Sequence, residues 1–115
     1  MSLRITAAVY SDTAIVVISE FGRTVAQKGN AGTDHGHGNG MWLMGAPVAG
    51  GQVHSEWPDL DDNALREGHD LNVTTDYRTV LAQICERHLR LPDTELSTVF
   101  PTMPRQQLVS VIVKT

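Results

Sequence analysis

Apolar residues form an unbroken run in 13-TAIVVIS-19, where the middle positions carry no polar alternation. A β-branched run of this kind is typical of a strand that is buried on both faces, as in a parallel sheet covered by helices. A second apolar run predicts a strand over 41–45, and 52-QVH-54 predicts a short extended piece. The segment 108-LVSVIVK-114 also has the composition of a strand.

The helical signal is strongest in 76-DYRTVLAQICERHLRL-91. Its apolar residues follow the i, i+3, i+4, i+7 spacing of an amphipathic helix and are Tyr77, Val80, Leu81, Ile84, Cys85 and Leu89. This spacing predicts a helix over 76–89 whose core-facing side chains are Val80, Leu81, Ile84 and Leu89. Thr74 or Thr75 can cap its N-terminus, and Pro92 ends it.

Weaker signals complete the order of elements. Residues 4–12 match the end of a helix near Ser11 and Asp12, residues 57–70 form a polar surface region, and 93–97 predict a helical turn. The chain is therefore α/β, with few strands and one long helix. A buried parallel strand needs helices on both faces, and the sequence hardly supplies them. We therefore expect residues 1–115 to be a single domain that is part of a larger one.

Composition narrows the class of protein. A chain of 115 residues that is 41% hydrophobic can bury a core of its own. The net charge is -4 with both signs scattered, which argues against a nucleic-acid partner. No apolar run reaches the length of a membrane span, and the N-terminus has no signal-peptide pattern. The single cysteine, Cys85, lies on the apolar helix face and is interpreted as a core residue.

The candidate chemistry lies in 33-TDHGHGNG-40, where Asp34, His35 and His37 alternate with glycines. Carboxylate and imidazole suit zinc, manganese or iron, and glycine lets the backbone approach an ion. Zinc needs three or four ligands, so other segments must complete the site. Glu20, at the end of the first strand, is the nearest candidate. His54 and His69 are weaker candidates.

These polar residues also have a structural interpretation. A His-Gly-His loop is often merely solvated, and aspartate and glycine are common turn residues. Glu20 and Arg23 can form a surface ion pair, which the sequence alone favours. His54 and His69 fit solvent-exposed positions, and His88 fits a cation at the C-terminus of the helix.

Several segments carry a resemblance to one family. They are 15-IVVISEFGRTV-25, 32-GTDHGHGNGMWLMGAPVAGGQV-53, Trp57-Pro58 and 70-DLNVTTDYRTVLAQICERHL-89. Together they resemble the bacterial domain of unknown function fifteen-hundred-and-one. Its members are associated with a twin-arginine export signal and are grouped with the alkaline phosphatase and sulfatase superfamily. The resemblance covers about residues 5–100, and SEFGR followed by GTDHG is its most specific part.

This resemblance implies an α/β fold like the C-terminal part of an alkaline-phosphatase-like domain. Family members are several times longer, and their upstream part would carry the first metal-binding acid, any nucleophile and an Asp-x-His segment. None of these occurs in this chain. The implied function is a fragment of a metal-dependent sulfatase- or phosphatase-like hydrolase that is inactive alone. Export to the periplasm is implied for members with a signal, so the localisation of this chain is open.

The metal-binding residues of the superfamily can be matched to this chain in two ways. By its letters, Asp34-His35-Gly36 resembles the Asp-His-Gly metal motif of sulfatases and phosphomutases. By strand order, Glu20 takes the position of the metal-binding acid, and the segment 34–37 takes that of a later histidine. We favour the match by strand order, because a shared order of strands and loops arises by chance less readily than a match of three residues. It makes Glu20 a ligand and makes His35 or His37 a ligand of a neighbouring metal.

With so few ligands, we expect the isolated chain to bind zinc or manganese weakly or not at all. One alternative is a non-enzymatic binding or assembly module that retains the loop, and another is a structural domain that binds no metal. A chain that lacks half its sheet leaves apolar faces and a strand edge uncovered. We therefore expect a homo-oligomer, or association with the missing N-terminal portion. The sequence identifies neither the substrate nor the metal.

Overall fold

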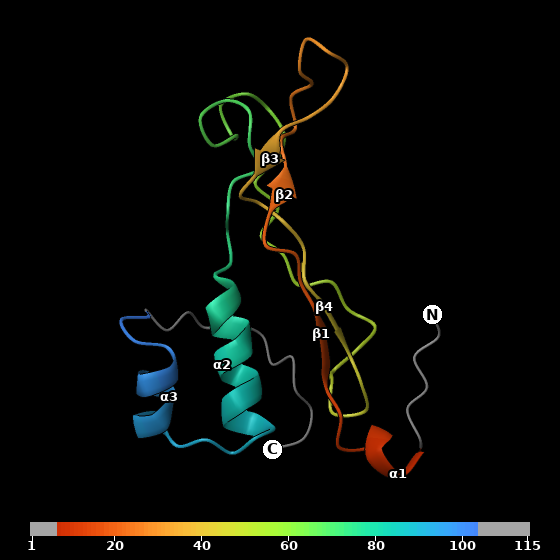
Figure 1. The fold of residues 1–115 in the computed structure, drawn as a ribbon, viewed down its shortest axis with the longest axis vertical. Helices are drawn as coiled ribbons and strands as arrows, with labels where there is room; N and C mark the ends of the chain where they lie inside the picture. The colour runs from red at the N-terminus through yellow and green to blue at the C-terminus, as the bar shows by residue number, and fades with distance from the viewer. Residues whose placement is uncertain (1–6, 104–115) are drawn as a thin grey trace. The chain divides into compact units, whose positions relative to one another are not determined.

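The computed structural model describes residues 7–103 of the chain (Figure 1). The chain forms two compact units, and each is built from segments that are separated in the sequence. The first unit takes the chain up to Val16, the segment Trp42–His54 and the chain from Asp76 onward. The second unit takes Val17–Met41 and Ser55–Thr75.

The helices and strands of the described residues are α1 (Ala7–Tyr10), β1 (Ile15–Val17), β2 (Gly22–Arg23), β3 (His35–Gly36), β4 (Trp42–Met44), α2 (Tyr77–Arg87) and α3 (Asp93–Val99). β1 pairs with β4 in one two-stranded sheet, and β2 pairs with β3 in another. The expected α/β class, with few strands and one long helix, is confirmed. The strand expected at 108–114 lies outside the described residues. Between residues 7 and 103, no helix is both long and apolar enough to cross a membrane.

The β1–β4 sheet corrects the expectation for the first strand. β1 has only three residues, and Val17 and Ile18 are exposed. The prediction of a strand over 13–19 that is buried on both faces is therefore wrong. Its one partner in the described residues is β4, and the side chain that packs into the core is Val16. The expected strand at 41–45 is confirmed as β4, whereas residues 52–54 are irregular and exposed.

α2 begins one residue after a charged cap. Asp76 is the N-cap, and its Oδ1 accepts a hydrogen bond from the Arg78 backbone N–H at 2.9 Å. The Arg78 guanidinium also donates to the Asp76 carboxylate, at 2.6 Å from Nη2. These hydrogen bonds from the Arg78 side chain lower the pKa of Asp76 and outweigh the opposing effect of burial. The expectation that Thr74 or Thr75 caps the helix is wrong, because Asp76 supplies the acceptor itself.

The core of the first unit is centred on Ile84 of α2. This side chain is buried, and the partly buried side chains against it are Val16, Leu43, Val48, Val80 and Leu81. The helix period thus predicts the inward positions well until the helix ends. Leu89 was expected in the core but is 61% exposed, because α2 stops at Arg87 and the 3.6-residue period no longer applies.

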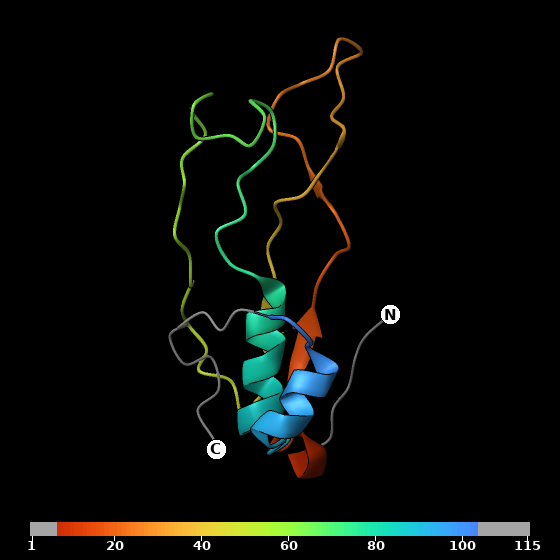
Figure 2. The ribbon, with the colours of Figure 1, turned by 90° about the vertical axis from the view of Figure 1, so that its left-hand side faces the viewer.

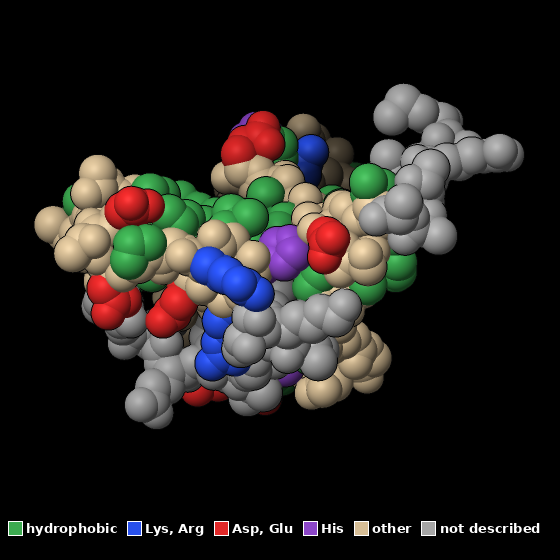
Figure 3. All heavy atoms as spheres, turned by 90° about the horizontal axis from the view of Figure 1, so that it is seen from below, with side chains coloured by type: hydrophobic (Ala, Val, Ile, Leu, Met, Phe, Trp, Pro, Cys, Tyr) green, Lys and Arg blue, Asp and Glu red, His purple; other side chains and the backbone are tan. Residues whose placement is uncertain are grey.

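The helix α3 lies beside α2 in both Figure 1 and Figure 2, and the two helices are in contact. Its buried residue is Leu96. The buried hydrophobic side chains of the described residues are Pro47, Leu65, Ile84 and Leu96. Hydrophobic side chains correspondingly occupy a broad part of the surface in the view from below (Figure 3). The described residues therefore bury little apolar surface for a chain of this composition.

The second unit is organised around the antiparallel pair β2 and β3, in which Gly22 faces Gly36 and Arg23 faces His35. The pairing continues beyond the strands, where the Thr24 N–H donates to the Asp34 carbonyl at 3.0 Å. Residues 57–70 supply turns, as expected for a polar region. Their last residue, Asp70, is however buried.

The core assignment of α2 can be tested with two leucine-sized side chains of opposite exposure. Ile84→Ala removes a buried side chain and should lower the free energy of unfolding by about 2–5 kcal/mol. Leu89→Ala removes an exposed side chain and should change it by only about 0.5 kcal/mol. Urea unfolding followed by circular dichroism measures both variants. Equal losses would contradict the observed end of α2.

Candidate functional site

The segment 33–40 is not an irregular loop, because β3 lies inside it. Gly36 and Gly38 are buried, and His35 and His37 are exposed. Since side chains alternate between faces in extended backbone, the two histidines project to the same side. The alternation of side chains therefore brings His35 and His37, two of the predicted ligands, onto one exposed face.

The glycines of this segment are explained by close packing against Asp70 and Leu71. A Cβ added to Gly36 would overlap Asp70 Oδ1 and stand 3.0 Å from the Arg23 carbonyl carbon. A Cβ added to Gly38 would stand 2.6 Å from the Leu71 carbonyl oxygen. The sequence suggested that glycine allows an ion to approach the backbone. In the structure, another part of the chain takes that space.

Asp70 is the residue of this site that sequence reasoning missed. It is 2% exposed, and its Oδ2 accepts hydrogen bonds from the His37 backbone N–H at 2.6 Å and from His37 Nδ1 at 2.9 Å. Asp70 Oδ1 is also buried and accepts no hydrogen bond from the described residues. The alternating glycines signal that some segment approaches closely, but nothing in the sequence identifies Asp70 as that neighbour.

The electrostatics of Asp70 favour its charged form. Burial is the largest influence and raises the pKa of the Asp70 carboxyl. The hydrogen bonds from the His37 backbone and ring, with a contribution from the Gly38 backbone, together outweigh burial and lower that pKa below its ordinary value. Asp70 is therefore a buried carboxylate whose charge is directed at His37.

The contact with Asp70 fixes the orientation of the His37 ring. Nδ1 faces the buried carboxylate, while the side chain as a whole is 67% exposed. When the neutral ring carries its proton on Nδ1 and donates it to Asp70, Nε2 retains a lone pair. An outward Nε2 of this kind can bind a metal ion or accept a proton.

The other predicted ligands have different surroundings. The His35 ring stacks on Phe21, with ring centroids 3.8 Å apart and planes 18° apart. Asp34 forms an ion pair with Lys28. Glu20 precedes Phe21 and is exposed, but within the described residues it forms no hydrogen bond or ion pair with the histidines.

The structure thus gathers the four predicted ligands in the second unit without closing a site. Across residues 7–103, no three side chains of His, Cys, Asp or Glu converge as a metal site requires. The two histidines share a face, whereas Asp34 is engaged with Lys28. The assignment of Glu20, Asp34, His35 and His37 as ligands stays a prediction.

The remaining histidines lie outside this cluster. His54 is exposed, and His69 lies 3.8 Å from the Glu67 carboxylate at the surface. His88 is the C-cap of α2, and its Nε2 lies 2.9 Å from the Asp12 carbonyl oxygen. This contact joins the end of α2 to the turn that follows α1.

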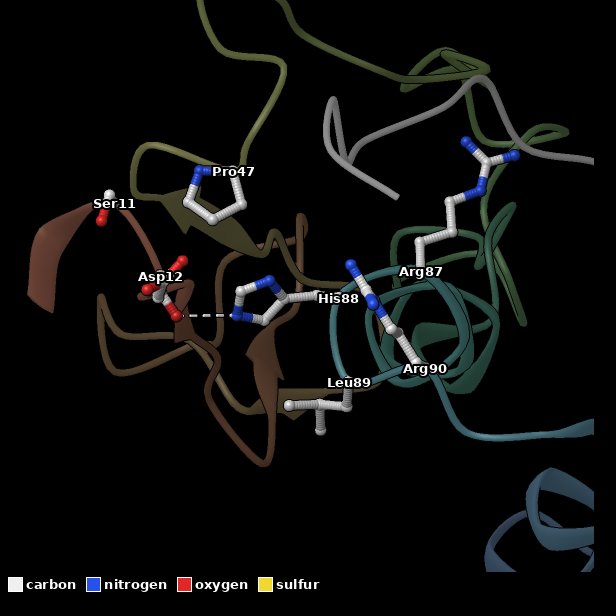
Figure 4. Close-up of a pocket in the computed structure, with 7 residues that line it drawn as sticks. All are labelled: Ser11, Asp12, Pro47, Arg87, His88, Leu89 and Arg90. Carbon is white, nitrogen blue, oxygen red and sulfur yellow. Dashed lines mark hydrogen bonds between the residues drawn. The ribbon is translucent and has the colours of Figure 1, made fainter.

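His88 also lines an open pocket of about 350 Å³ in the first unit (Figure 4). The lining residues are Ser11, Asp12, Pro47, Arg87, His88, Leu89 and Arg90. Figure 4 shows the His88 ring directed at Asp12. His88 therefore serves to hold the helix end in place, and the predicted ligands all lie elsewhere.

The fold and the site define a small α/β protein with a glycine-rich, histidine-bearing segment held against a buried aspartate. A family model described as Protein of unknown function (DUF1501) matches residues 7–100. The match spans most of the chain, and the protein belongs to this family. Searches of the curated proteins and of the solved structures found no match. The family is therefore established, and its description assigns no activity.

The close packing of the segment can be tested with a pair of glycines. Gly36→Ala should destabilise the fold by more than about 2 kcal/mol, because its Cβ would overlap a buried carboxylate. Gly40→Ala is the control, since nothing lies within 4 Å of a Cβ at that position. We expect it to be neutral or to stabilise by about 0.4–1 kcal/mol. Similar unfolding midpoints for the two variants in urea would contradict the packing.

The charge of Asp70 makes stability depend on pH. The folded-state pKa of Asp70 is lowered, so its contribution is fully present above the unfolded-state pKa of about 4 and is lost as pH falls through the folded value. Asp70→Asn should reduce the acid-induced loss of unfolding free energy, whereas the exposed Asp34→Asn should change it less. Urea unfolding between about pH 2 and pH 7 measures this. If the unfolding free energy of wild type and of Asp70→Asn fell equally with decreasing pH, the interpretation of Asp70 as a buried carboxylate with a lowered pKa would be contradicted.

Proposed function

We propose that this chain supplies part of the metal-binding site of a sulfatase- or phosphatase-like hydrolase and does not catalyse hydrolysis alone. The observation that carries the proposal is the His37–Asp70 pair, in which a buried carboxylate holds an exposed imidazole at 2.9 Å. Metal-binding histidines commonly donate their other ring N–H to a carboxylate, which fixes the tautomer and raises the basicity of the ligand nitrogen.

The exposure of His37 is what favours a functional interpretation. A surface ion pair contributes little to stability, and burying the Asp70 carboxylate has a cost in desolvation. If the His37–Asp70 pair served only to stabilise the fold, we would expect both side chains to be buried. Here only the carboxylate is buried, and the imidazole remains accessible. This arrangement supports a role for the outward Nε2 toward a ligand.

The donor set fits a divalent ion of the zinc or manganese type. His37 and His35 would offer nitrogen from the same exposed face, and Glu20 would offer carboxylate oxygen. Asp34 would join only after leaving Lys28. Further ligands would come from the upstream part of a longer domain, of which this chain resembles the C-terminal portion. When bound, such an ion polarises the transferred group and activates a nucleophile.

The chain's own residues would act as follows. Asp70 would orient His37 by accepting a hydrogen bond from Nδ1, and in the neutral ring the lone pair then lies on Nε2. Phe21 limits the motion of the His35 ring through stacking. Lys28 would compete with the ion for Asp34, which weakens binding in the isolated chain.

A second candidate is a non-enzymatic binding or assembly module that retains the loop. It is favoured by the glycines, because Gly36 and Gly38 are fully accounted for by packing against Asp70 and Leu71. In that case the segment is a folded element of an interaction domain, and His37 has no metal to bind.

Zinc and manganese titrations separate the two candidates. Wild type should bind one of these ions weakly in isothermal titration calorimetry, and His37→Ala or His35→Ala should abolish or sharply weaken the binding. Asp70→Asn should lower the affinity by about 10–100-fold, the effect expected for a residue that orients a ligand.

His54→Ala is the matched control, because His54 is exposed and lies in the other unit. Circular dichroism of each variant verifies that it is folded. A wild-type chain that takes up neither ion would favour the assembly module. Equal losses in His37→Ala and His54→Ala would show nonspecific binding and count against the proposed site.

A further inference from the structure

The segment 33–40 ends in Asn39-Gly40, a pair that takes no part in the packing against Asp70 or in the proposed metal site. Both residues are exposed. Asn39 Nδ2 donates a hydrogen bond to the Phe21 carbonyl at 3.1 Å, and Asn39 Oδ1 accepts one from the Gly40 backbone N–H at 2.7 Å. The Asn39 side chain is therefore folded back toward the backbone nitrogen of the next residue.

This conformation places two reactive atoms next to each other. Oδ1 is bonded directly to Cγ, so the Gly40 nitrogen that donates to Oδ1 lies beside the carbonyl carbon of the Asn39 side chain. When a backbone nitrogen attacks the side-chain carbonyl carbon of the preceding asparagine, a five-membered succinimide ring closes. Holding the two atoms close together in advance lowers the barrier of such an intramolecular step.

Gly40 also leaves room for the ring to close. Within residues 7–103, no atom lies within 4 Å of a Cβ at position 40, and glycine has more backbone freedom than any other residue. The other three asparagines of the chain, Asn30, Asn63 and Asn72, each precede a residue that has a Cβ. A Cβ restricts the backbone dihedral angles through which the ring closes. Asn39 is therefore the asparagine of this chain that is best placed to react.

We propose that Asn39 is a site of spontaneous deamidation through a succinimide formed with Gly40. The Gly40 nitrogen gives its proton to a solvent base and forms a bond with Asn39 Cγ, while the bond from Cγ to Nδ2 breaks and ammonia leaves. Water then opens the ring. Cleavage between the Gly40 nitrogen and Cγ gives aspartate, and cleavage between that nitrogen and the backbone carbonyl carbon of Asn39 gives isoaspartate. No atom is oxidised or reduced, and water is the co-reactant.

The reaction removes a contact on which the second unit depends. Nδ2 is the atom that leaves, so the hydrogen bond from Asn39 to the Phe21 carbonyl is lost, and a carboxylate then faces that carbonyl. The Phe21 ring stacks on His35, so the residue that Asn39 holds is the one that restrains His35. Deamidation should therefore weaken the stacking of His35, whether or not the segment binds a metal.

Peptide mapping by mass spectrometry tests the reaction in the full, folded chain kept at mildly alkaline pH. The mass increase from amide to acid should appear first at Asn39, with aspartate and isoaspartate both formed, and the other three asparagines serve as internal controls. Gly40→Ala is the matched variant, because its added Cβ has open space around it. It should slow the conversion of Asn39 at least ~10-fold, a change in barrier of about 1.4 kcal/mol.

NMR of the His35 ring tests the consequence. Asn39→Asp reproduces the aspartate product and should shift the His35 ring signals away from their stacked positions, whereas Gly40→Ala should leave them in place. Circular dichroism verifies that each sample is folded.

Three results would overturn the proposal. The first is conversion of Asn39 in the folded chain no faster than that of the other asparagines. The second is conversion of Asn39 only in urea, which would show that the fold protects it. The third is equal conversion of Asn39 in wild type and in Gly40→Ala. Unchanged His35 signals in Asn39→Asp would overturn the proposed effect on the stacking.

Discussion

The second unit depends on one buried charge. The Asp70 carboxylate packs against Gly36 of β3, and the absence of a side chain at Gly36 leaves the space from which the carboxylate reaches the His37 backbone and ring. The hydrogen bonds offset the cost of burying the charge. A side chain at position 36 would overlap the carboxylate, and without Asp70 the His37 ring would lose the hydrogen-bond partner that orients it. Fold and candidate chemistry therefore rest on the same contact.

The sequence predicts best where structure is local. The period of α2 predicts the inward Val80, Leu81 and Ile84, because consecutive turns of one helix determine which side chains share a face. It fails at Leu89, where the chain leaves the helix. The predicted N-cap is wrong for a related reason. Thr74, Thr75 and Asp76 can all cap a helix, and the residue at which the helical backbone begins makes Asp76 the cap.

Long-range features were harder to predict. The apolar run 13–19 has the composition of a doubly buried strand, but its burial depends on what covers it, and only one face of β1 meets the core. The sequence predicts a surface position for Asp70 among its polar neighbours, because its partner His37 lies 33 positions away and no local pattern links the two. The candidate histidines were found from spacing and glycine content. Asp34 forms an ion pair with Lys28 and does not join the two histidines, and the sequence pattern does not predict this ion pair.

The order in which the chain visits its two units limits how the protein can be divided. The first unit takes segments that end at Val16, span Trp42–His54 and resume at Asp76, and the second unit takes the intervening stretches. No single cut yields either unit as one continuous polypeptide. Limited proteolysis between Met41 and Trp42, or between His54 and Ser55, would divide both units between two fragments. A continuous segment of this chain that contains the whole of either unit therefore also contains residues of the other unit.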